Sequence, residues 1–528
     1  MTTPMLSPRL AHLAVALLLS SCAAFLGADA SVHEYAGERF TENGNGFVLH
    51  GGSEGVYASA AAGAFIRFEK VVFRRTPESA AAEAEDGNRT ATVTAVIFEA
   101  GDRDTVGGTD AAGGRALCCT ADMARLGRCT EGALALRRAP PNGWPRVLAA
   151  SFPPGPGGLE AAFPDETVAV SRTGMYTLLF VHCDASLAGE VAAAEGSKTI
   201  WKNSRAGYLP GRMAPLLPFY GGLSLAFASL AAYWFARYAR HWRDVAPLQS
   251  LATLVIALGM AEAATWYFDL AELGESGARP RGAAVWAATA GALRGAASRV
   301  LALLVAKGHG VVRPVRVGFT ARVVGLGAAF FVAAEALEVA ENVGAVSDHA
   351  PASPARRMFL VLPVAALNAV FVYWIFSSLS KTLSKLKARR MTAKLEMYRK
   401  FTNALIIGVA LSLGWITFEF HFESTDEYNE RWRAAWIIPA GWQLISFSLL
   451  CAVCLIWAPS HSSMRYAYSD EEGEECDLED TRPLIRPGPL SYVDIWAISV
   501  SQDDTKVILR TDSGGVYAVK AGDGDKRV

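Results

Sequence analysis

Residues 436–458 read WIIPAGWQLISFSLLCAVCLIWA, a continuous apolar run without a charged side chain. A helix needs about twenty such residues to cross the roughly 30 Å hydrocarbon core of a bilayer. Six similar runs precede it, so the set comprises residues 214–236, 247–268, 284–306, 320–340, 357–380, 401–420 and 436–458. The pattern predicts an all-α membrane bundle of seven helices over residues 214–459.

The overall composition is typical of a membrane protein. Hydrophobic residues make up 52% of the 528 residues and charged residues 19%, against about 25% charged in soluble domains. The apolar composition makes membrane lipids the expected partners. The formal net charge of −1 says nothing about partners, and because a bulk basic face is absent, nucleic acid is not expected. No nucleophile–base pair, metal-ligand cluster or phosphate-binding loop stands out, so neither an enzyme nor a cofactor is predicted.

The loops between the apolar runs differ in charge. The first, third and fifth loops are basic, with Arg237, Arg240, Arg243, Lys307, Arg313, Arg316, Lys381, Lys385, Lys387, Arg389, Arg390, Lys394, Arg399 and Lys400. The second, fourth and sixth are acidic, with Asp269, Glu272, Glu275, Glu341, Asp348, Glu423, Asp426, Glu427 and Glu430. Because positive loops stay in the cytosol, this asymmetry predicts a lumenal N-terminus and a cytosolic C-terminus.

Residues 1–30 have the three parts of a secretory signal. Arg9 provides the positive start, Leu10–Leu19 is the apolar segment, and Ala28-Asp29-Ala30 is a small-x-small cleavage site. The alternative is a signal anchor that is retained, although the apolar segment is short for a span. Cleavage would leave residue 31 onward in an oxidising lumen, where disulfides can form.

Residues 31–186 predict strands rather than helices. Short β-branched and aromatic runs, such as FIRFEKVVF at 65–73 and TVTAVIF at 92–98, alternate with Gly, Pro, Asp and Asn turns. Two packed sheets are the simplest way to bury such strands. We therefore expect a lumenal β-sandwich, followed by a linker over residues 187–213.

Four cysteines lie in this predicted sandwich: Cys118, Cys119, Cys129 and Cys183. Neighbouring cysteines rarely bridge each other, so the favoured pairings join Cys129 and Cys183 to one each of the adjacent pair, in either order. The spacing lacks a metal-ligand pattern. Asn88 opens an Asn-Arg-Thr sequon and is a predicted glycosylation site.

The histidines of this region are His33, His50 and His182, and each stands alone in the sequence without a Ser or Cys nucleophile motif. No catalytic set is predicted. The domain is interpreted as a recognition module for a lumenal protein or a lipid.

Five charged residues fall inside the apolar runs: Glu262, Arg294, Arg299, Glu335 and Glu338. Charges at membrane depth are costly unless they are paired or hydrated. One interpretation is a polar cavity or ion path. The other is a structural salt bridge, for example between Arg299 and either Glu262 or Glu335. The spacing of Glu335 and Glu338 places them on one helical face.

Residues 460–528 form a predicted cytosolic tail. It opens with an acidic run that contains Asp470, Glu471, Glu472, Glu474, Glu475, Asp477, Glu479 and Asp480. Asp480, Leu484 and Ile485 fit the acidic-dileucine pattern that clathrin adaptors bind, so adaptor or coat proteins are candidate partners. Strand-like runs follow near Tyr492, at 506–510 and at 516–519, and Tyr492 fits either a second sorting pattern or a small β-meander.

Several motifs in and beside the spans point to one family. They are PFYG at 218–221, YARHWRD at 238–244, LGMAE at 258–262, Arg299 with GHGVVRP at 308–314, RVVGLG at 322–327, YRKFTN at 398–403 and WAPS at 457–460. The set resembles the GOLD-domain seven-transmembrane proteins, also called the lung seven-transmembrane receptor family. Within that family it is similar to the transmembrane protein 87 branch, and a plant source is expected. The resemblance implies a GOLD-like sandwich with residues 174–183 as its last strand.

The same resemblance implies a function. It suggests a Golgi or endosomal multi-pass membrane protein in vesicular trafficking, notably endosome-to-Golgi retrograde transport. The alternatives are a Golgi cation channel or pH-linked ion conductor, and a seven-transmembrane ligand receptor. The loop between the sixth and seventh spans contains no cysteine, so a disulfide from the sandwich to that loop is not expected.

Overall fold

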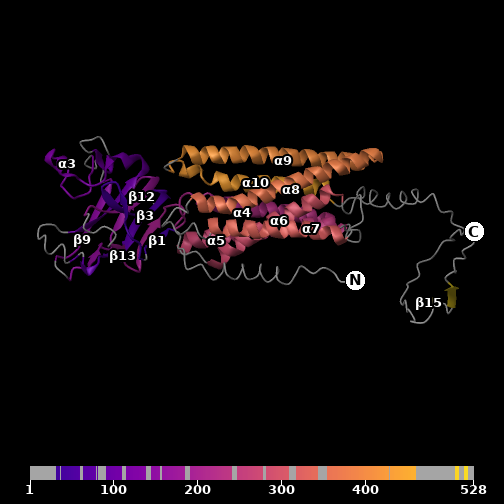
Figure 1. Ribbon diagram of the computed structural model, residues 1–528, viewed down its shortest axis with the longest axis horizontal. Helices are drawn as coiled ribbons and strands as arrows, with labels where there is room; N and C mark the ends of the chain where they lie inside the picture. The colour runs from indigo at the N-terminus through magenta and orange to yellow at the C-terminus, as the bar shows by residue number, and fades with distance from the viewer. Residues whose placement is uncertain are drawn as a thin grey trace, which may run out of the picture. The chain divides into compact units, whose positions relative to one another are not determined.

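The computed structural model describes residues 31–458 and two strands at 506–510 and 516–520 (Figure 1). Within 31–458 the gaps are residues 36, 60–62, 79, 81–90, 110–114, 138–143, 155–156, 185–190, 241–246, 278–280, 309–316, 343–353 and 427–428. The predicted signal at residues 1–30, the sequon at Asn88 and the sorting motif at Asp480, Leu484 and Ile485 lie outside the described residues. The chain divides into two compact units, Met1–Ala467 and Tyr468–Val528.

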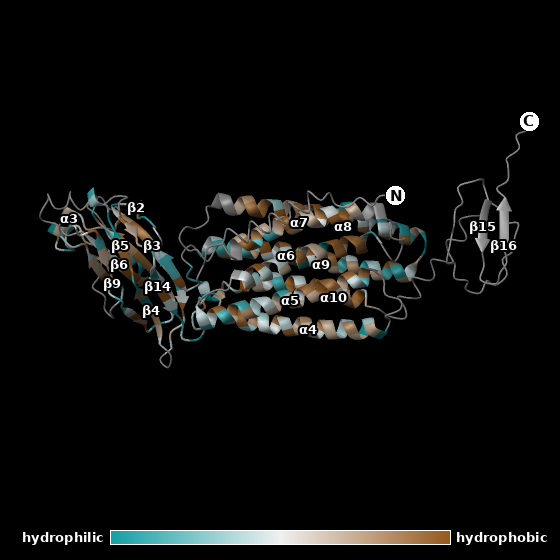
Figure 2. Ribbon diagram, turned by 90° about the horizontal axis from the view of Figure 1, so that it is seen from below, coloured by the Kyte–Doolittle hydropathy of each residue, from teal (hydrophilic) through white to brown (hydrophobic). Residues whose placement is uncertain are grey.

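Seven long helices in the described part of the chain are apolar enough to cross a membrane, as the sequence predicts. They are α4 (Leu216–Arg240), α5 (Pro247–Ser276), α6 (Arg281–Ala306), α7 (Val317–Asn342), α8 (Pro354–Ala388), α9 (Thr392–Thr425) and α10 (Ile437–Ile456). Helix α6 packs against α5, α7 and α8, and α10 packs against α4 and α9. Figure 2 shows hydrophobic residues over much of the length of these helices.

Helices α8 and α9 are longer than the apolar runs that predict them. α8 continues to Ala388 and α9 begins at Thr392, so charged turns follow the apolar ones without a break. The hydropathy pattern stops where lysines and arginines begin, but Lys, Arg, Leu and Met all favour helix, so the helices continue. Residues 389–391 join the two helices into a hairpin.

The N-terminal region folds as antiparallel sheets. Its strands are β1 (Val32–Tyr35), β2 (Thr41–Asn43), β3 (Gly46–Val56), β4 (Ala64–Glu69), β5 (Val72–Arg74), β6 (Thr92–Glu99), β7 (Gly108–Thr109), β8 (Arg115–Ala116), β9 (Arg146–Ser151), β10 (Glu160–Ala162), β11 (Thr167–Val170), β12 (Gly174–His182), β13 (Ala192–Ala193) and β14 (Ser197–Lys202). The two main sheets have the strand orders β1-β14-β4-β11 and β2-β3-β12-β6-β9, and a smaller one has β10-β5-β13. Short helical segments are η1 (Ala100–Thr105), α3 (Ala121–Arg125) and η4 (Trp432–Ala434).

Aromatic side chains fill the space between the sheets. Phe68 of β4 and Phe180 of β12 meet edge to face with 6.4 Å between ring centroids, which joins the two main sheets. Phe73, Phe163 and Trp201 are buried in the same cluster. The predicted β-sandwich is therefore present.

Two predictions about the sandwich boundary are wrong. Residues 187–213 are not all linker, because β13 and β14 lie within them and β14 sits between β1 and β4. Residues 174–183 are not the last strand, since β12 is followed by these two. In β14 the side chains of Ser197, Thr199 and Trp201 are buried, and the residues between them are half-buried. This alternation has the period of two that is typical of a strand.

Both disulfides match one of the two predicted connectivities. Cys118 bonds to Cys183 and Cys119 bonds to Cys129, with sequence separations of 65 and 10 residues. The longer bridge ties the end of β12 to the segment after β8. The shorter one closes the loop that carries α3.

The second unit contains one described strand pair. β15 (Lys506–Arg510) and β16 (Val516–Lys520) are antiparallel, with Ile508 opposite Ala518. These strands coincide with the two strand-like runs predicted there.

Candidate functional site

The charged residues within the spans include one tight cluster between α5, α6 and α10. Arg294 on α6 donates through Nε to Oε2 of Glu262 on α5 and through Nη2 to Oε1 of the same carboxylate, at 3.2 Å for the second bond. Its remaining donors reach α10, to the Ser446 hydroxyl at 2.7 Å and the Gln443 side-chain oxygen at 2.9 Å. The Gln443 amide in turn donates to Glu262 at 2.9 Å.

This cluster is closed to solvent. Glu262 is 4% exposed and Arg294 is 8% exposed. A guanidinium and a carboxylate removed from water are tolerated only when further hydrogen bonds satisfy their remaining groups, which Gln443 and Ser446 do here. The cluster therefore holds three helices together at membrane depth.

Arg299 does not form the predicted salt bridge with Glu262 or Glu335. Its Nε donates to the side-chain oxygen of Asn368 on α8 at 2.6 Å, and its guanidinium lies 4.0 Å from the ring centroid of Phe330 on α7. Arg299 lies five residues after Arg294, about 1.4 helical turns, so the two side chains leave α6 in directions about 140° apart and only Arg294 faces α5. Which arginine pairs with Glu262 depends on the rotation of α6 about its axis, and the sequence alone does not determine that rotation.

Glu335 on α7 has a different setting. The Thr289 hydroxyl on α6 donates to its Oε1 at 2.7 Å. Its Oε2 is buried and has no hydrogen-bond partner among the residues that the structure describes. Glu338 lies one turn further along α7 and is half-buried. Of the five predicted residues, Glu262 and Arg294 form a joined pair, and Glu338 on α7 interacts electrostatically with Arg294. Arg299 and Glu335 bind other side chains.

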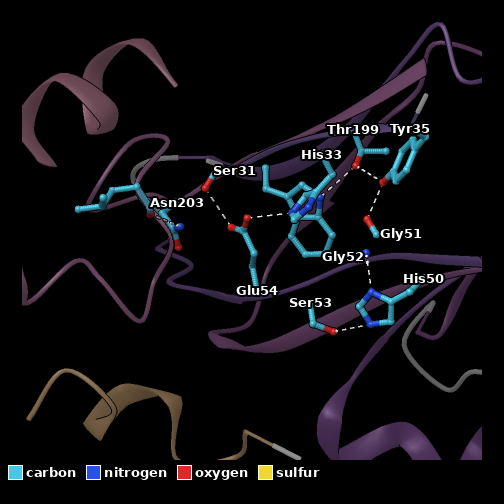
Figure 3. Close-up of polar contacts among 12 residues, drawn as sticks. Ser31, His33, Tyr35, His50, Gly51, Gly52, Ser53, Glu54, Thr199 and Asn203 are labelled. Carbon is cyan, nitrogen blue, oxygen red and sulfur yellow. Dashed lines mark hydrogen bonds and ion pairs between the residues drawn. The ribbon is translucent and has the colours of Figure 1, made fainter. Parts of the chain in front are cut away.

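A second polar group, which the sequence did not indicate, joins the two sheets of the sandwich (Figure 3). Ser31 donates to Glu54 Oε2 at 3.0 Å, and His33 Nε2 lies 3.0 Å from Glu54 Oε1. His33 and Glu54 are each 5% exposed, so the contact is a buried bridge from β1 to β3. Gly52 makes room for it, because a Cβ there would lie 2.9 Å from the His33 ring.

The same seam continues along β1. The Tyr35 hydroxyl donates to the Gly51 carbonyl and contacts Thr199 Oγ1 at 2.7 Å on β14 (Figure 3). Ser31 and His33 each contact Glu54 rather than each other, so the arrangement is not a nucleophile–base relay. It is a structural seam between sheets.

The segment that connects the sandwich to the helical bundle contacts both of them. The Gly211 amide donates to the Gly55 carbonyl at 3.0 Å, and the Tyr208 amide donates to the Gly274 carbonyl near the end of α5 at 2.9 Å. Asn203 accepts from the Tyr57 amide at 2.6 Å and donates to the Leu209 carbonyl at 2.8 Å. These bonds fix the segment that leads from β14 to α4.

An aromatic side chain from the loop before α10 completes this joint. Trp432 is 4% exposed and meets Tyr57 edge to face with 4.8 Å between centroids. It lies so close to β3 that a Cβ on Gly55 would be 2.2 Å from its ring. The loop between the sixth and seventh spans therefore contacts the sandwich through Trp432. A disulfide between this loop and the sandwich is not expected, because the loop has no cysteine.

His182 and Glu38 in the sandwich have strongly shifted pKa values. Burial lowers the pKa of His182 to about 4, and its ring lies between Phe47 and Phe40 at 4.7 and 4.8 Å. Burial also raises the pKa of Glu38 to about 7. Among the described residues no group of three or more His, Cys, Asp or Glu side chains could hold a metal ion.

Fold and site together define a multi-pass membrane protein that carries an N-terminal β-sandwich on a seven-helix bundle. Residues 215–464 match the family described as "GOST, seven transmembrane domain". The helices α4 to α10 all lie within the matched residues.

Named relatives are also similar to this chain. The chain is 31% identical over 283 residues to "Transmembrane protein 87A" of Homo sapiens, which covers 53% of this chain and 49% of that one. It is 30% identical over 282 residues to "Transmembrane protein 87B" of Homo sapiens, covering 51% and 48%. It is 24% identical over 321 residues to "Membrane protein PTM1" of Saccharomyces cerevisiae, covering 59% of each. The chain thus spans about half the length of the curated human relatives it matches.

Proposed function

We propose that this protein acts in vesicular trafficking in the Golgi and endosomes, in endosome-to-Golgi retrieval. In this proposal the sandwich faces the lumen and binds a protein or lipid ligand. The bundle anchors it, and the cytosolic tail binds adaptor or coat proteins through Asp480, Leu484 and Ile485.

The observation that carries the proposal is the closed state of the Glu262–Arg294 cluster. An ion path needs charges that water or ions can reach, whereas this carboxylate is 4% exposed and accepts from Arg294 and Gln443. The cluster thus supports a scaffold in which charge binds helices together. The close contact between Trp432 and Gly55 also supports a scaffold, because it joins the sandwich to the loop before α10 of the bundle.

The tail motif gives the direct test. Leu484→Ala with Ile485→Ala should shift the steady-state protein from the Golgi to later endosomes or the cell surface, and should slow the return of a surface-labelled cohort. Leu490→Ala with Ile498→Ala removes two aliphatic side chains of the same kinds from the same tail and is the matched control. An unchanged distribution and return rate for the dileucine variant would rule out the proposed role of the tail.

A cation-conducting function is a second candidate, and Glu335 is the observation that favours it. A buried carboxylate with one oxygen left without a hydrogen bond among the described residues is a position where a proton or cation could bind. Purified protein in liposomes would then pass cations between about pH 5 and pH 8, and Glu335→Gln would change that flux while Glu396→Gln, at an exposed ion pair, would not. Absence of flux over this range would contradict the candidate.

A further inference from the structure

The end of the α8–α9 hairpin is strongly basic. Between residues 381 and 400 seven cations are exposed: Lys381, Lys385, Lys387, Arg389, Arg390, Arg399 and Lys400. Glu396 is the single acidic residue of that stretch, and it pairs with Lys400 at 3.0 Å. Figure 2 shows hydrophilic residues where α8 and α9 meet. We name residues 381–400 the basic hairpin.

The basic hairpin is held at its base. The Thr382 hydroxyl donates to the Ala306 carbonyl at 2.8 Å, and the Tyr398 hydroxyl donates to the Val305 carbonyl at 3.1 Å. Both acceptors are among the last four carbonyls of α6, and the Val305 carbonyl also accepts from the Gly308 amide at 2.9 Å. Leu386 is buried between these points and the turn. The exposed cations therefore sit on a fixed support.

The turn itself has an unusual occupant. The Arg390 amide donates to the Lys387 carbonyl at 3.2 Å and the Met391 amide to the Leu386 carbonyl at 3.2 Å, which is the Schellman pattern that ends a helix. Arg390 occupies the left-handed position of that pattern with φ of 55°, where glycine is the usual residue. An arginine is thus placed at the outermost point of the hairpin at a conformational cost.

The hairpin reaches beyond the hydrocarbon core. From Thr382 to the turn the chain advances by about seven residues, or roughly 10 Å at 1.5 Å per residue. A headgroup layer is about 5–8 Å thick on each side of the bilayer. Lys381, Arg399 and Lys400 lie near the level of α6's end, which we take as the edge of the hydrocarbon core because the apolar run stops there. With that edge, the four tip cations Lys385, Lys387, Arg389 and Arg390 reach the headgroups.

Orientation rules explain a positive loop but not this geometry. A positive loop suffices to keep a segment in the cytosol, whereas here two helices continue past the core and concentrate four cations at one tight turn. Cation clusters directly beside a span attract anionic headgroups. Arginine side chains bind phosphate with two parallel hydrogen bonds, and a compact group of cations is neutralised best by a headgroup that carries several phosphate charges.

We propose that the basic hairpin binds the phosphorylated inositol headgroup of a lipid in the leaflet it faces. The site consists of Lys385, Lys387, Arg389 and Arg390 at the tip. It rests on the cytosolic orientation of this loop in the proposed function, because such lipids face the cytosol.

The test uses the purified full chain in detergent micelles with water-soluble short-chain lipids. Binding of short-chain phosphatidylinositol 4-phosphate is measured by titration beside phosphatidylserine of the same chain length, at about 0.15 M salt, where the screening length is about 8 Å. The tip variant carries Lys385→Gln, Lys387→Gln, Arg389→Gln and Arg390→Gln. The matched control carries Arg39→Gln, Lys70→Gln, Arg125→Gln and Arg128→Gln, four exposed cations of the sandwich with the same change in charge.

Each cation near a headgroup contributes about fivefold to affinity, so losing all four should weaken binding of the inositol lipid by roughly six-hundredfold, and by about thirtyfold where only two of them contact the headgroup. The control should keep its affinity. Arg389→Lys with Arg390→Lys keeps the charge and should lose part of the affinity. Equal loss in tip and control variants, or wild-type affinity for phosphatidylserine as high as for the inositol lipid, would overturn the proposal. Binding does not depend on cargo or sorting, so this result is independent of the trafficking test.

Discussion

Arg294 carries a charge that is almost completely out of water, and groups on the two neighbouring helices α5 and α10 neutralise or hydrogen-bond it. Gln443 is central to this arrangement because it accepts from Arg294 and donates to Glu262 at the same time. An amide with one donor and one acceptor engaged in this way fixes the relative height of α5, α6 and α10.

Removing one partner of this pair should be costly. Glu262→Gln leaves the guanidinium buried without its counter-charge, and breaking a buried pair in this way costs about 3–5 kcal/mol. Thermal unfolding of the detergent-purified variant should show a clear drop in midpoint, whereas Glu396→Gln at the exposed pair with Lys400 should stay near wild type. Equal small effects of the two substitutions would show that the cluster does not hold the helices.

His182 gives the sandwich a pH dependence with a definite sign. Its pKa in the fold is about 4, below the ordinary value of 6.5, so the unfolded chain binds its proton first as the pH falls. Stability is therefore lost from about pH 6.5 downward and levels off near pH 4, with about 2 kcal/mol gone at pH 5. His182→Phe keeps an aromatic ring between Phe40 and Phe47 and should shrink the difference in melting midpoint between pH 7 and pH 5.

Comparing the wild type with His182→Phe isolates the contribution of His182 to the pH dependence of stability. Glu38 acts in the opposite sense, because its raised pKa favours the protonated form in the fold, but it is present in both proteins and its contribution cancels. An unchanged pH dependence in His182→Phe would mean that another group causes it.

At the scale of elements, the two disulfides should contribute unequally. The Cys118–Cys183 bridge closes a segment with a sequence separation of 65 residues, and the Cys119–Cys129 bridge one of 10. Loop-closure entropy grows with the closed length, so the predicted contributions are about 4 and about 3 kcal/mol. Paired serine substitutions, Cys118→Ser with Cys183→Ser and Cys119→Ser with Cys129→Ser, should lower the unfolding midpoint in that order. The reverse order would point to local packing around the short bridge.

The elements also show how far the sequence predicts this fold. The seven spans were predictable because a run of about twenty apolar residues has few alternatives to crossing a membrane. The ends of α8 and α9 were not, because hydropathy stops at Lys381 while helix propensity continues. β14 was not predicted, although Ser197, Thr199 and Trp201 are buried with the period of a strand. Its sequence SKTIWK has only two apolar residues, so it does not stand out as a strand.

The candidate site was predictable in its membership but not in its pairing. Charged residues inside apolar runs identified Glu262 and Arg294 at once. Their neutral partners Gln443 and Ser446 lie in the seventh apolar run, and a search for polar residues at membrane depth would have found them. Which arginine meets which glutamate depends on helix rotation, and that information is absent from a single sequence.

At the scale of the whole first unit, the joint between sandwich and bundle depends on the absence of a side chain at Gly55. Gly55→Ala would place a Cβ against Trp432 and should cost about 1–3 kcal/mol through overpacking, so hydrogen exchange of residues 203–211 should rise about tenfold. Gly101→Ala is the control, since a Cβ there meets nothing within 4 Å.

The double variant decides whether Trp432 is the cause. Trp432→Ala alone should also loosen the joint. Adding Gly55→Ala to it should have little further effect, because the clashing ring is gone, and this non-additivity distinguishes a specific contact from general destabilisation.

The position of β14 also sets an order of events during synthesis. This strand lies between β1 and β4, so the four-stranded sheet lacks an interior member until residue 202 has left the ribosome. Only residues 203–215 then remain before α4 begins at Leu216. Because chains are made from the N-terminus and domains fold as units, the sandwich closes at about the time the first span enters the bilayer. A slow translation step in this short interval would therefore delay domain closure and membrane insertion together.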